Sequence, residues 1–174
     1  MTQIKLPHIP QFPQEAKIHL PQETKIPSPR NKISKESFYK KMNDYELVTA
    51  IRGAIFDVFK TLGPGLLESA YEEALTEEIS LRGLNVDRQV PVPIYYKGKQ
   101  LPTKLQLDLL VEKRIIVELK AVEKGLQPVH YRQLQTYLRL SNLHRGILVN
   151  FNTDYIDKQD IETVFNKYCT RKNS

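Results

Sequence analysis

Three charged side chains interrupt a stretch of sequence that is otherwise rich in Val, Ile and Leu. Residues 105–120 read LQLDLLVEKRIIVELK, and the apolar runs in this stretch contain Asp108, Glu118 and Lys120. A charge on a buried strand costs several kcal/mol unless it is paired or binds a metal ion. Two carboxylates and one ammonium group in this setting are therefore candidates for a metal-binding or catalytic site.

The elements that must position these groups are two strands. Short apolar runs at 107–111 and 115–119 flank a charged break at 112–114. Such runs around a polar turn predict a β-hairpin in a sheet that is covered on both faces. Because Glu118 and Lys120 are two residues apart, they point to the same face of their strand.

The length of the hairpin loop decides whether the two carboxylates meet. Side chains that stand opposite each other in an antiparallel pair share a face. A three-residue loop at 112–114 places Asp108 opposite Glu118, whereas a two-residue turn places Asp108 opposite Leu119 and the carboxylates on different faces. A shared site therefore requires the odd loop, or a bulge of the same parity.

Each charge also has an ordinary structural interpretation. Glu118 and Lys120 could form an exposed ion pair, worth about 0–1 kcal/mol. Asp108 could be a hydrogen-bonding residue at the end of a strand. The spacing alone leaves these alternatives open.

Two helices are expected before the hairpin. Apolar residues recur at helical spacing over 46–62, with Asn43 or Asp44 as a candidate cap. The sequence Gly-Pro-Gly at 63–65 ends this helix, and a second helix is expected over 66–82.

The second helix carries a further acidic candidate near its start. Gly65, Glu68 and Tyr71 are spaced by three, so they lie close together on one side of the helix. The ordinary interpretation of Glu68 is a first-turn carboxylate that suits the helix dipole. Four other acidic residues are expected on the solvated side of this helix: Glu72, Glu73, Glu77 and Glu78.

The remaining elements complete a mixed α/β fold. Strands are expected at 86–92, as a sheet edge broken by prolines, at 94–96 and at 144–151, and a weaker helix is expected at 158–168. This order predicts an α/β fold with a small mixed sheet flanked by helices.

A third core helix is expected over 128–140, with Pro128 in its first turn. His130, Gln133 and Tyr137 share one face of this helix. His130 has an equally ordinary interpretation as a satisfied or surface histidine, and Tyr137 as a packing residue.

Composition and charge limit the classes of protein to which this chain can belong. The 174 residues are 40% hydrophobic and 26% charged, and no apolar run approaches the roughly 20 residues that a membrane span needs. A single cysteine, Cys169, excludes an internal disulfide and fits a reducing compartment. We expect a cytoplasmic protein that does not bind a membrane.

The basic excess belongs to the N-terminal segment. Residues 1–41 hold eight Lys/Arg, three Glu and six of the 11 prolines, which leaves a net charge of +1 for the rest of the chain. This composition predicts a disordered tail. A basic segment that contacts nucleic acid, and a natural start at Met42, remain alternatives. We expect a folded domain over 42–168 and a short C-terminal tail over 169–174.

The candidate residues together resemble the site of the PD-(D/E)XK nuclease superfamily. Asp108, with Glu118-Leu119-Lys120 ten residues later, is similar to the D…(D/E)XK pattern, and GLLESAY at 65–71 matches the motif of the GxxExxY family within it. The agreement covers roughly residues 44–166. The resemblance implies a restriction-endonuclease-like core.

The resemblance also implies roles for the candidate residues. Asp108 and Glu118 would bind Mg²⁺ or Mn²⁺, with Glu68 as a further acidic member and the carbonyl of Leu119 as an extra ligand. Lys120 would orient the attacking water or stabilise charge on phosphate. Three residues of the 128–140 helix would line the cleft and contact substrate: His130, Gln133 and Tyr137.

These expectations lead to two classes of function. The first is a Mg²⁺-dependent nuclease that hydrolyses phosphodiester bonds of DNA. The second is a non-catalytic protein that keeps the nuclease fold and binds nucleic acid or serves as an accessory subunit, which the near-neutral charge of the core favours.

Overall fold

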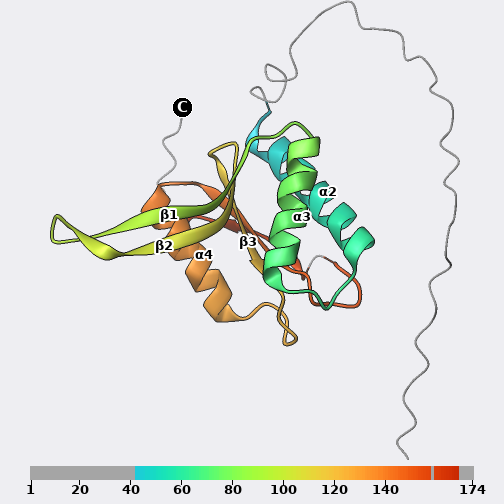
Figure 1. The fold of residues 1–174 in the computed structure, drawn as a ribbon. Helices are drawn as coiled ribbons and strands as arrows, with labels where there is room; N and C mark the ends of the chain where they lie inside the picture. The colour runs from blue at the N-terminus through green and yellow to red at the C-terminus, as the bar shows by residue number, and fades with distance from the viewer. Residues whose placement is uncertain (1–41, 158, 169–174) are drawn as a thin grey trace, which may run out of the picture. The chain divides into compact units, whose positions relative to one another are not determined.

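The computed structural model describes residues 42–157 and 159–168. The expectations for 1–41 and 169–174 lie outside the described residues. The described chain folds into three helices and five strands (Figure 1). In chain order they are α2 (Asp44–Leu62), α3 (Glu68–Leu81), β1 (Val86–Tyr96), β2 (Lys99–Val111), β3 (Ile115–Lys120), α4 (Pro128–Ser141), β4 (Arg145–Asn150) and β5 (Ile161–Phe165).

The strands form one mixed sheet in the order β1-β2-β3-β4-β5. β3 and β4 are parallel, whereas the other neighbouring pairs are antiparallel. The parallel pair requires a crossover connection, and α4 supplies it. β3 lies in the middle of the sheet, and all six of its residues are buried. The expected α/β fold with a small mixed sheet is confirmed.

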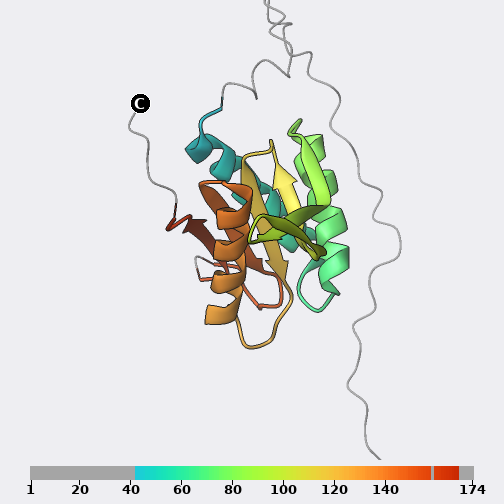
Figure 2. The same ribbon diagram turned by 90° about the vertical axis from the view of Figure 1, so that its left-hand side faces the viewer.

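The sheet separates two apolar clusters, which makes three layers (Figure 2). Helices α2 and α3 cover one face, where Leu47, Ile51 and Leu75 pack against alternate residues of the central strands. Helix α4 covers the other face, where Leu134 and Leu138 pack against Ile116 and Leu148. Covering both faces explains why the central strands read as continuous apolar runs.

The two N-terminal helices follow the sequence closely. Asn43 caps α2 by accepting hydrogen bonds from the amides of Tyr45 and Glu46, and the Glu46 carboxylate accepts in return from the amide of Asn43. This reciprocal pair is a capping box. Helix α3 begins at Glu68, two residues later than expected, so 63–67 form the connecting loop.

Two expectations about the strands need correction. The segment 86–96 is one continuous strand, because β1 is an edge strand and a proline there need not break the hydrogen-bonded ladder. The helix expected over 158–168 is wrong, since Ile161–Phe165 form the strand β5. Ile161 packs in the cluster beneath α2 and α3, and Val164 packs in the cluster beneath α4. A spacing of three buries opposite faces of a strand, and it imitates one face of a helix.

None of the helices in the described part of the chain is both long enough and apolar enough to cross a membrane.

Candidate active site

The register of the β2–β3 hairpin brings the two strand carboxylates to one face of the sheet. Val111 pairs with Ile115 and Leu109 pairs with Val117, so three residues, 112–114, form the loop. The paired ladder ends at Leu109 and Val117, and continuing its parity by one residue places Asp108 and Glu118 on the same face of the sheet. The odd loop that a shared site requires is therefore confirmed.

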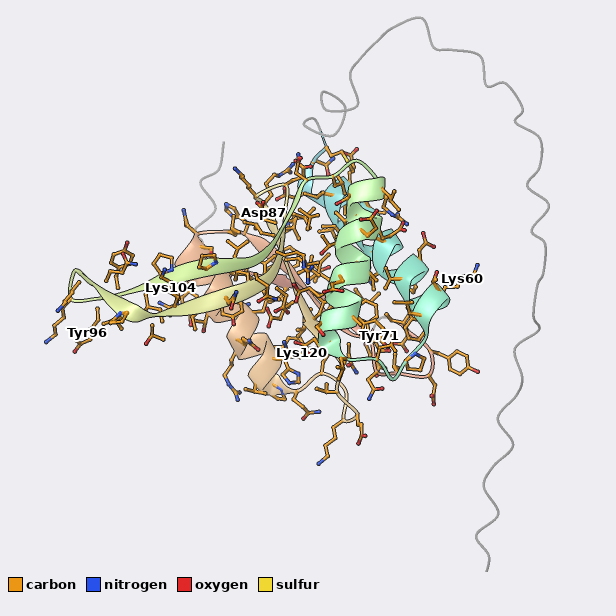
Figure 3. All side chains as sticks on the ribbon, in the orientation of Figure 1. Lys60, Tyr71, Asp87, Tyr96, Lys104 and Lys120 are labelled. Atoms are coloured by element: carbon orange, nitrogen blue, oxygen red, sulfur yellow. The ribbon has the colours of Figure 1, made fainter. Side chains whose placement is uncertain are left out.

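Lys120 lies within reach of carboxylates from both strand and helix. Its Nζ donates hydrogen bonds to Oε1 of Glu118 at 2.8 Å and to the carbonyl oxygen of Leu119 at 2.7 Å. The same Nζ is 3.9 Å from Oε1 of Glu68. Figure 3 shows Lys120 near the first turn of α3, the helix that begins at Glu68. The structure thus joins Glu68, Glu118 and Lys120 in one cluster.

The two strand carboxylates have different surroundings. Glu118 is 1% exposed, and its Oε2 is a buried oxygen with no hydrogen-bond partner. Asp108 is half-buried, and its Oδ2 accepts a hydrogen bond from the amide of Leu119 at 2.8 Å. An unpartnered buried carboxylate oxygen is costly, so it indicates a place for a proton, a cation or a substrate group.

Burial shifts the acidity of both carboxyl groups. Burial, with smaller effects from nearby Glu68 and Glu72, raises the pKa of Asp108 to about 6. Burial and the neighbouring Asp108 raise the pKa of Glu118 to about 7. Burial alone would lower the pKa of Lys120, but the attraction of Glu118 and the other carboxylates raises it. The ammonium group therefore stays charged while the carboxylates compete for protons near neutral pH.

The loop before α3 positions Glu68 through Tyr71. The Tyr71 hydroxyl donates to the carbonyl of Gly63 at 2.6 Å and accepts from the amide of Leu66 at 3.1 Å. Its ring stacks on Phe151 with centroids 4.5 Å apart. Figure 3 shows this buried ring beside the same end of α3. Tyr71 thus fixes the path of the loop that delivers Glu68.

Glu72 was placed wrongly by sequence reasoning. The expectation that it lies on the solvated side of α3 is incorrect, because Glu72 is 6% exposed. Its carboxylate accepts hydrogen bonds from Nε of Arg88 at 3.0 Å and Nε2 of Gln89 at 2.5 Å. The sequence position of Glu72 could have indicated its burial, since Glu72 follows Glu68 by four residues and so shares its side of the helix.

Gln89 also marks an irregularity beside the site. In the β1–β2 register it stands across from Asp108, and its φ of 49° is left-handed. Leu107 packs in the cluster beneath α4, whereas Leu109 packs in the cluster beneath α2 and α3. In a regular strand Leu107 and Leu109 would share a face, so β2 must twist at Asp108. Irregular strand pairing of this kind changes the direction of a side chain.

The three candidates on α4 divide into two groups. Gln133 donates a hydrogen bond from Nε2 to the Tyr137 hydroxyl at 2.9 Å, and Tyr137 is buried. Burial raises the pKa of Tyr137, and the charges of Glu118 and Asp108 add to the effect, so this hydroxyl lies on the side of the site. His130 instead accepts from the amide of Gln127 at 3.0 Å and completes the helix cap.

The donor set can be compared with what a hard divalent cation needs. In the described part of the chain, no group of three or more His, Cys, Asp or Glu side chains is arranged to hold a metal ion. Mg²⁺ commonly uses only one or two carboxylates and completes its coordination with water and phosphate. Asp108 and the unpartnered oxygen of Glu118 fit that smaller requirement, and both carboxylates would be relieved of mutual repulsion by a cation.

Comparison with known proteins gives the family. The model of the PD-(D/E)XK nuclease superfamily matches residues 45–164. No curated protein matches the chain. A solved structure titled "Crystal structure of SSO0001" is 24% identical, with 76% of this chain and 73% of that chain covered and a TM-score of 0.40, which is too low to support an argument. The family match covers most of the chain, including every residue of the cluster, and the chain belongs to the PD-(D/E)XK nuclease superfamily.

Proposed function

We propose that this chain is a Mg²⁺-dependent or Mn²⁺-dependent nuclease that hydrolyses phosphodiester bonds of DNA, and that it is a member of the GxxExxY group of its superfamily. The observation that carries the proposal is the half-buried Asp108 and the buried Glu118 on one face of the sheet beside the Lys120 ammonium group, with Oε2 of Glu118 unpartnered. The sequence from Gly65 to Tyr71 supports the finer family assignment.

Each group of the cluster has a distinct role in this reaction. Asp108 and Glu118 hold the cation, which when bound acts as a Lewis acid on phosphate and lowers the pKa of bound water. Lys120 stays protonated, since the carboxylates around it raise its pKa. Its ammonium group orients the attacking water or stabilises charge that develops on the phosphate oxygens. Glu68 balances this charge from α3.

Helix α4 supplies polar side chains beside the carboxylates. The Gln133 amide and the Tyr137 hydroxyl form one hydrogen-bonded pair on the side of the carboxylates. A substrate phosphate or the attacking water is the natural partner for the remaining donor of this pair. The Nδ1 atom of His130 is engaged in capping α4, so a contact between His130 and substrate is made through Nε2.

The proposal is tested by nuclease assays with Mg²⁺ or Mn²⁺ on single-stranded, duplex and branched DNA. Asp108→Asn and Lys120→Ala should each lower cleavage by at least about 100-fold. Titration calorimetry with Mn²⁺ should show one site that Asp108→Asn loses and Lys120→Ala keeps. Glu123→Gln, at an exposed carboxylate outside the cluster, is the matched control and should cut normally. Absence of wild-type cleavage on every substrate would refute the proposal.

A second candidate is a non-catalytic nucleic-acid-binding or accessory protein. The observation that favours it is charge, since residues 42–168 hold 16 Lys/Arg and 17 Asp/Glu, whereas a nuclease usually presents a basic surface to phosphate. DNA binding that falls steeply with salt but does not depend on metal, without cleavage, would establish this candidate.

A further inference from the structure

The outer part of a two-stranded ribbon extends beyond the three-layered body, while the base of the ribbon packs in the cluster beneath α4 through Val90, Val92 and Leu105. The ribbon consists of residues 89–106, the parts of β1 and β2 beyond Asp108, with the turn between them. Figure 1 shows the ribbon projecting to one side of the helices. All residues from 95 to 100 are exposed. A two-stranded hairpin without such packing is only marginally stable, so the length of the outer part needs a functional reason.

The charge of the ribbon differs in sign from that of the body. Residues 89–106 contain Lys97, Lys99 and Lys104 and no Asp or Glu. The rest of 42–168 contains 13 basic and 17 acidic residues. None of the three ribbon lysines is paired with a carboxylate among the described residues. The ribbon is therefore a local cationic surface on an acidic body, and it suits a polyanion.

Two tyrosines stand among these lysines. Tyr95 is 62% exposed and Tyr96 is 63% exposed, so both rings are available to a partner. The Lys97 ammonium group lies 5.5 Å from the centre of the Tyr96 ring. Tyrosine and lysine side chains side by side are typical of contacts to phosphate and sugar. Figure 3 shows Tyr96 and Lys104 along the ribbon, far from Lys60 on α2.

The edges of the ribbon argue against a protein strand as the partner. β1 is an edge strand of the sheet and carries Pro91 and Pro93, and Pro102 lies in β2. Proline cannot donate a backbone hydrogen bond, and prolines on an edge discourage the addition of another strand. Recognition must then come from side chains, and the side chains available here are cationic and aromatic.

The ribbon is joined firmly to the candidate active site. Gln106 donates from Nε2 to the carbonyl of Gln89, and Gln89 in turn donates to the buried Glu72 of α3. Lys104 precedes Asp108 by four residues of one strand, which is about 13 Å, and the turn is about 25–30 Å away. At about 3.4 Å per base pair, that distance equals roughly eight base pairs of duplex.

We propose that the ribbon 89–106 is a nucleic-acid-binding element that holds the phosphates of a duplex on one side of the cleavage site. A two-stranded ribbon has the size to follow the major groove. Lys97, Lys99 and Lys104 contact phosphates, and Tyr96 contacts the sugar-phosphate backbone. The link to cleavage rests on the proposed nuclease function, whereas the binding itself does not.

The test compares two double variants of the full chain that remove the same charge. One is Lys97→Gln with Lys104→Gln in the ribbon, and the other is Lys60→Gln with Lys113→Gln on the body. All four side chains are exposed. Binding to a fluorescent 24-base-pair duplex is followed by anisotropy at several salt concentrations, with EDTA present to prevent cleavage.

The ribbon double variant should lower the slope of log affinity against log salt by about two and weaken binding roughly tenfold or more. The body double variant should leave the slope unchanged. A second pair, Tyr96→Ala against Tyr155→Ala on the body, where Tyr155 is 85% exposed, should weaken binding only for Tyr96. Equal effects of the ribbon and body variants, or no effect of either, would overturn the proposal.

Failure of this proposal and failure of the nuclease proposal give different results. If the ribbon does not bind duplex, the slopes coincide while wild type still cleaves with metal. If the chain is not a nuclease, no cleavage occurs while the ribbon variants still bind more weakly than wild type.

Discussion

At the scale of single residues, the candidate site places carboxyl groups in a buried environment that disfavours their charged form. Asp108 and Glu118 lie on one face of the sheet, and burial raises the pKa of each carboxyl group. Both residues and Lys120 could be found from sequence, because a charge inside an apolar run is costly enough to require a reason. The burial of Glu72 could not be predicted, because the sequence does not show which side of α3 is covered by the β1 residues Arg88 and Gln89.

The raised pKa values predict how stability depends on pH. Between about pH 4.5 and pH 7 the folded protein binds protons at Glu118 that the unfolded chain has released. Stability of the metal-free protein therefore falls as pH rises through this window. Glu118→Gln removes the charge but keeps the shape, so it should be more stable than wild type at pH 8, by on the order of 1–2 kcal/mol, and nearly equal at pH 5.

Urea unfolding at the two pH values, in buffer with chelator, measures this difference. Glu123→Gln is the control, because that carboxylate is exposed and should show no such dependence. Equal stability of Glu118→Gln and wild type at pH 8 would mean that the buried carboxylate carries no electrostatic cost.

At the scale of elements, residue spacing predicted some helices and strands but not others. The β2–β3 hairpin was predictable, since the loop length fixes which residues share a face. β5 was not predictable, because Ile161 and Val164 bury opposite faces of a short strand at a spacing that also suits a helix. The role of Tyr71 was visible only in part, since its hydrogen bonds run back to a loop rather than to the neighbouring turn of α3.

Tyr71→Phe tests whether the loop positions Glu68. The change keeps the stacked ring but removes the hydroxyl that joins Gly63 to Leu66. The free energy of unfolding should fall by about 1 kcal/mol, because the Gly63 carbonyl and the Leu66 amide lose their partly buried hydrogen-bond partner. Cleavage should fall at temperatures where the variant is fully folded.

A double-mutant comparison separates positioning from general destabilisation. In a Glu68→Gln background, Tyr71→Phe should have little further effect on cleavage, because both changes act on the same group. Additive losses of cleavage would show that Tyr71 acts elsewhere.

At the scale of the whole molecule, charge is divided between regions. The ribbon 89–106 carries three basic residues and no acidic residue, while the body around the site is acidic overall. A substrate with many phosphates is thus attracted at a distance from the carboxylates and repelled near them until a cation is present. Neither the sequence nor its net charge revealed this division, since the separation depends on the ribbon leaving the body (Figure 1).

This division predicts a dependence on substrate length. Duplexes with fewer than roughly eight base pairs on one side of the cleavage point cannot reach the end of the ribbon. Wild-type kcat/KM should therefore drop as that flank is shortened below this length, mainly through KM. The double variant Lys97→Gln with Lys104→Gln should begin at the lower value and show no such drop. A length dependence that is the same in both proteins would contradict the prediction.

The central strand β3 pairs with β4 along its whole length and with β2 over 115–117, both of its faces are covered, and it carries Glu118 and Lys120. All six of its residues are buried, so hydrogen exchange of its paired amides should be slow and should report the opening of the sheet. Glu118, whose carboxyl pKa is raised by burial, thus lies in the segment that is expected to unfold last. Heat inactivation would then accompany the collapse of the domain instead of preceding it.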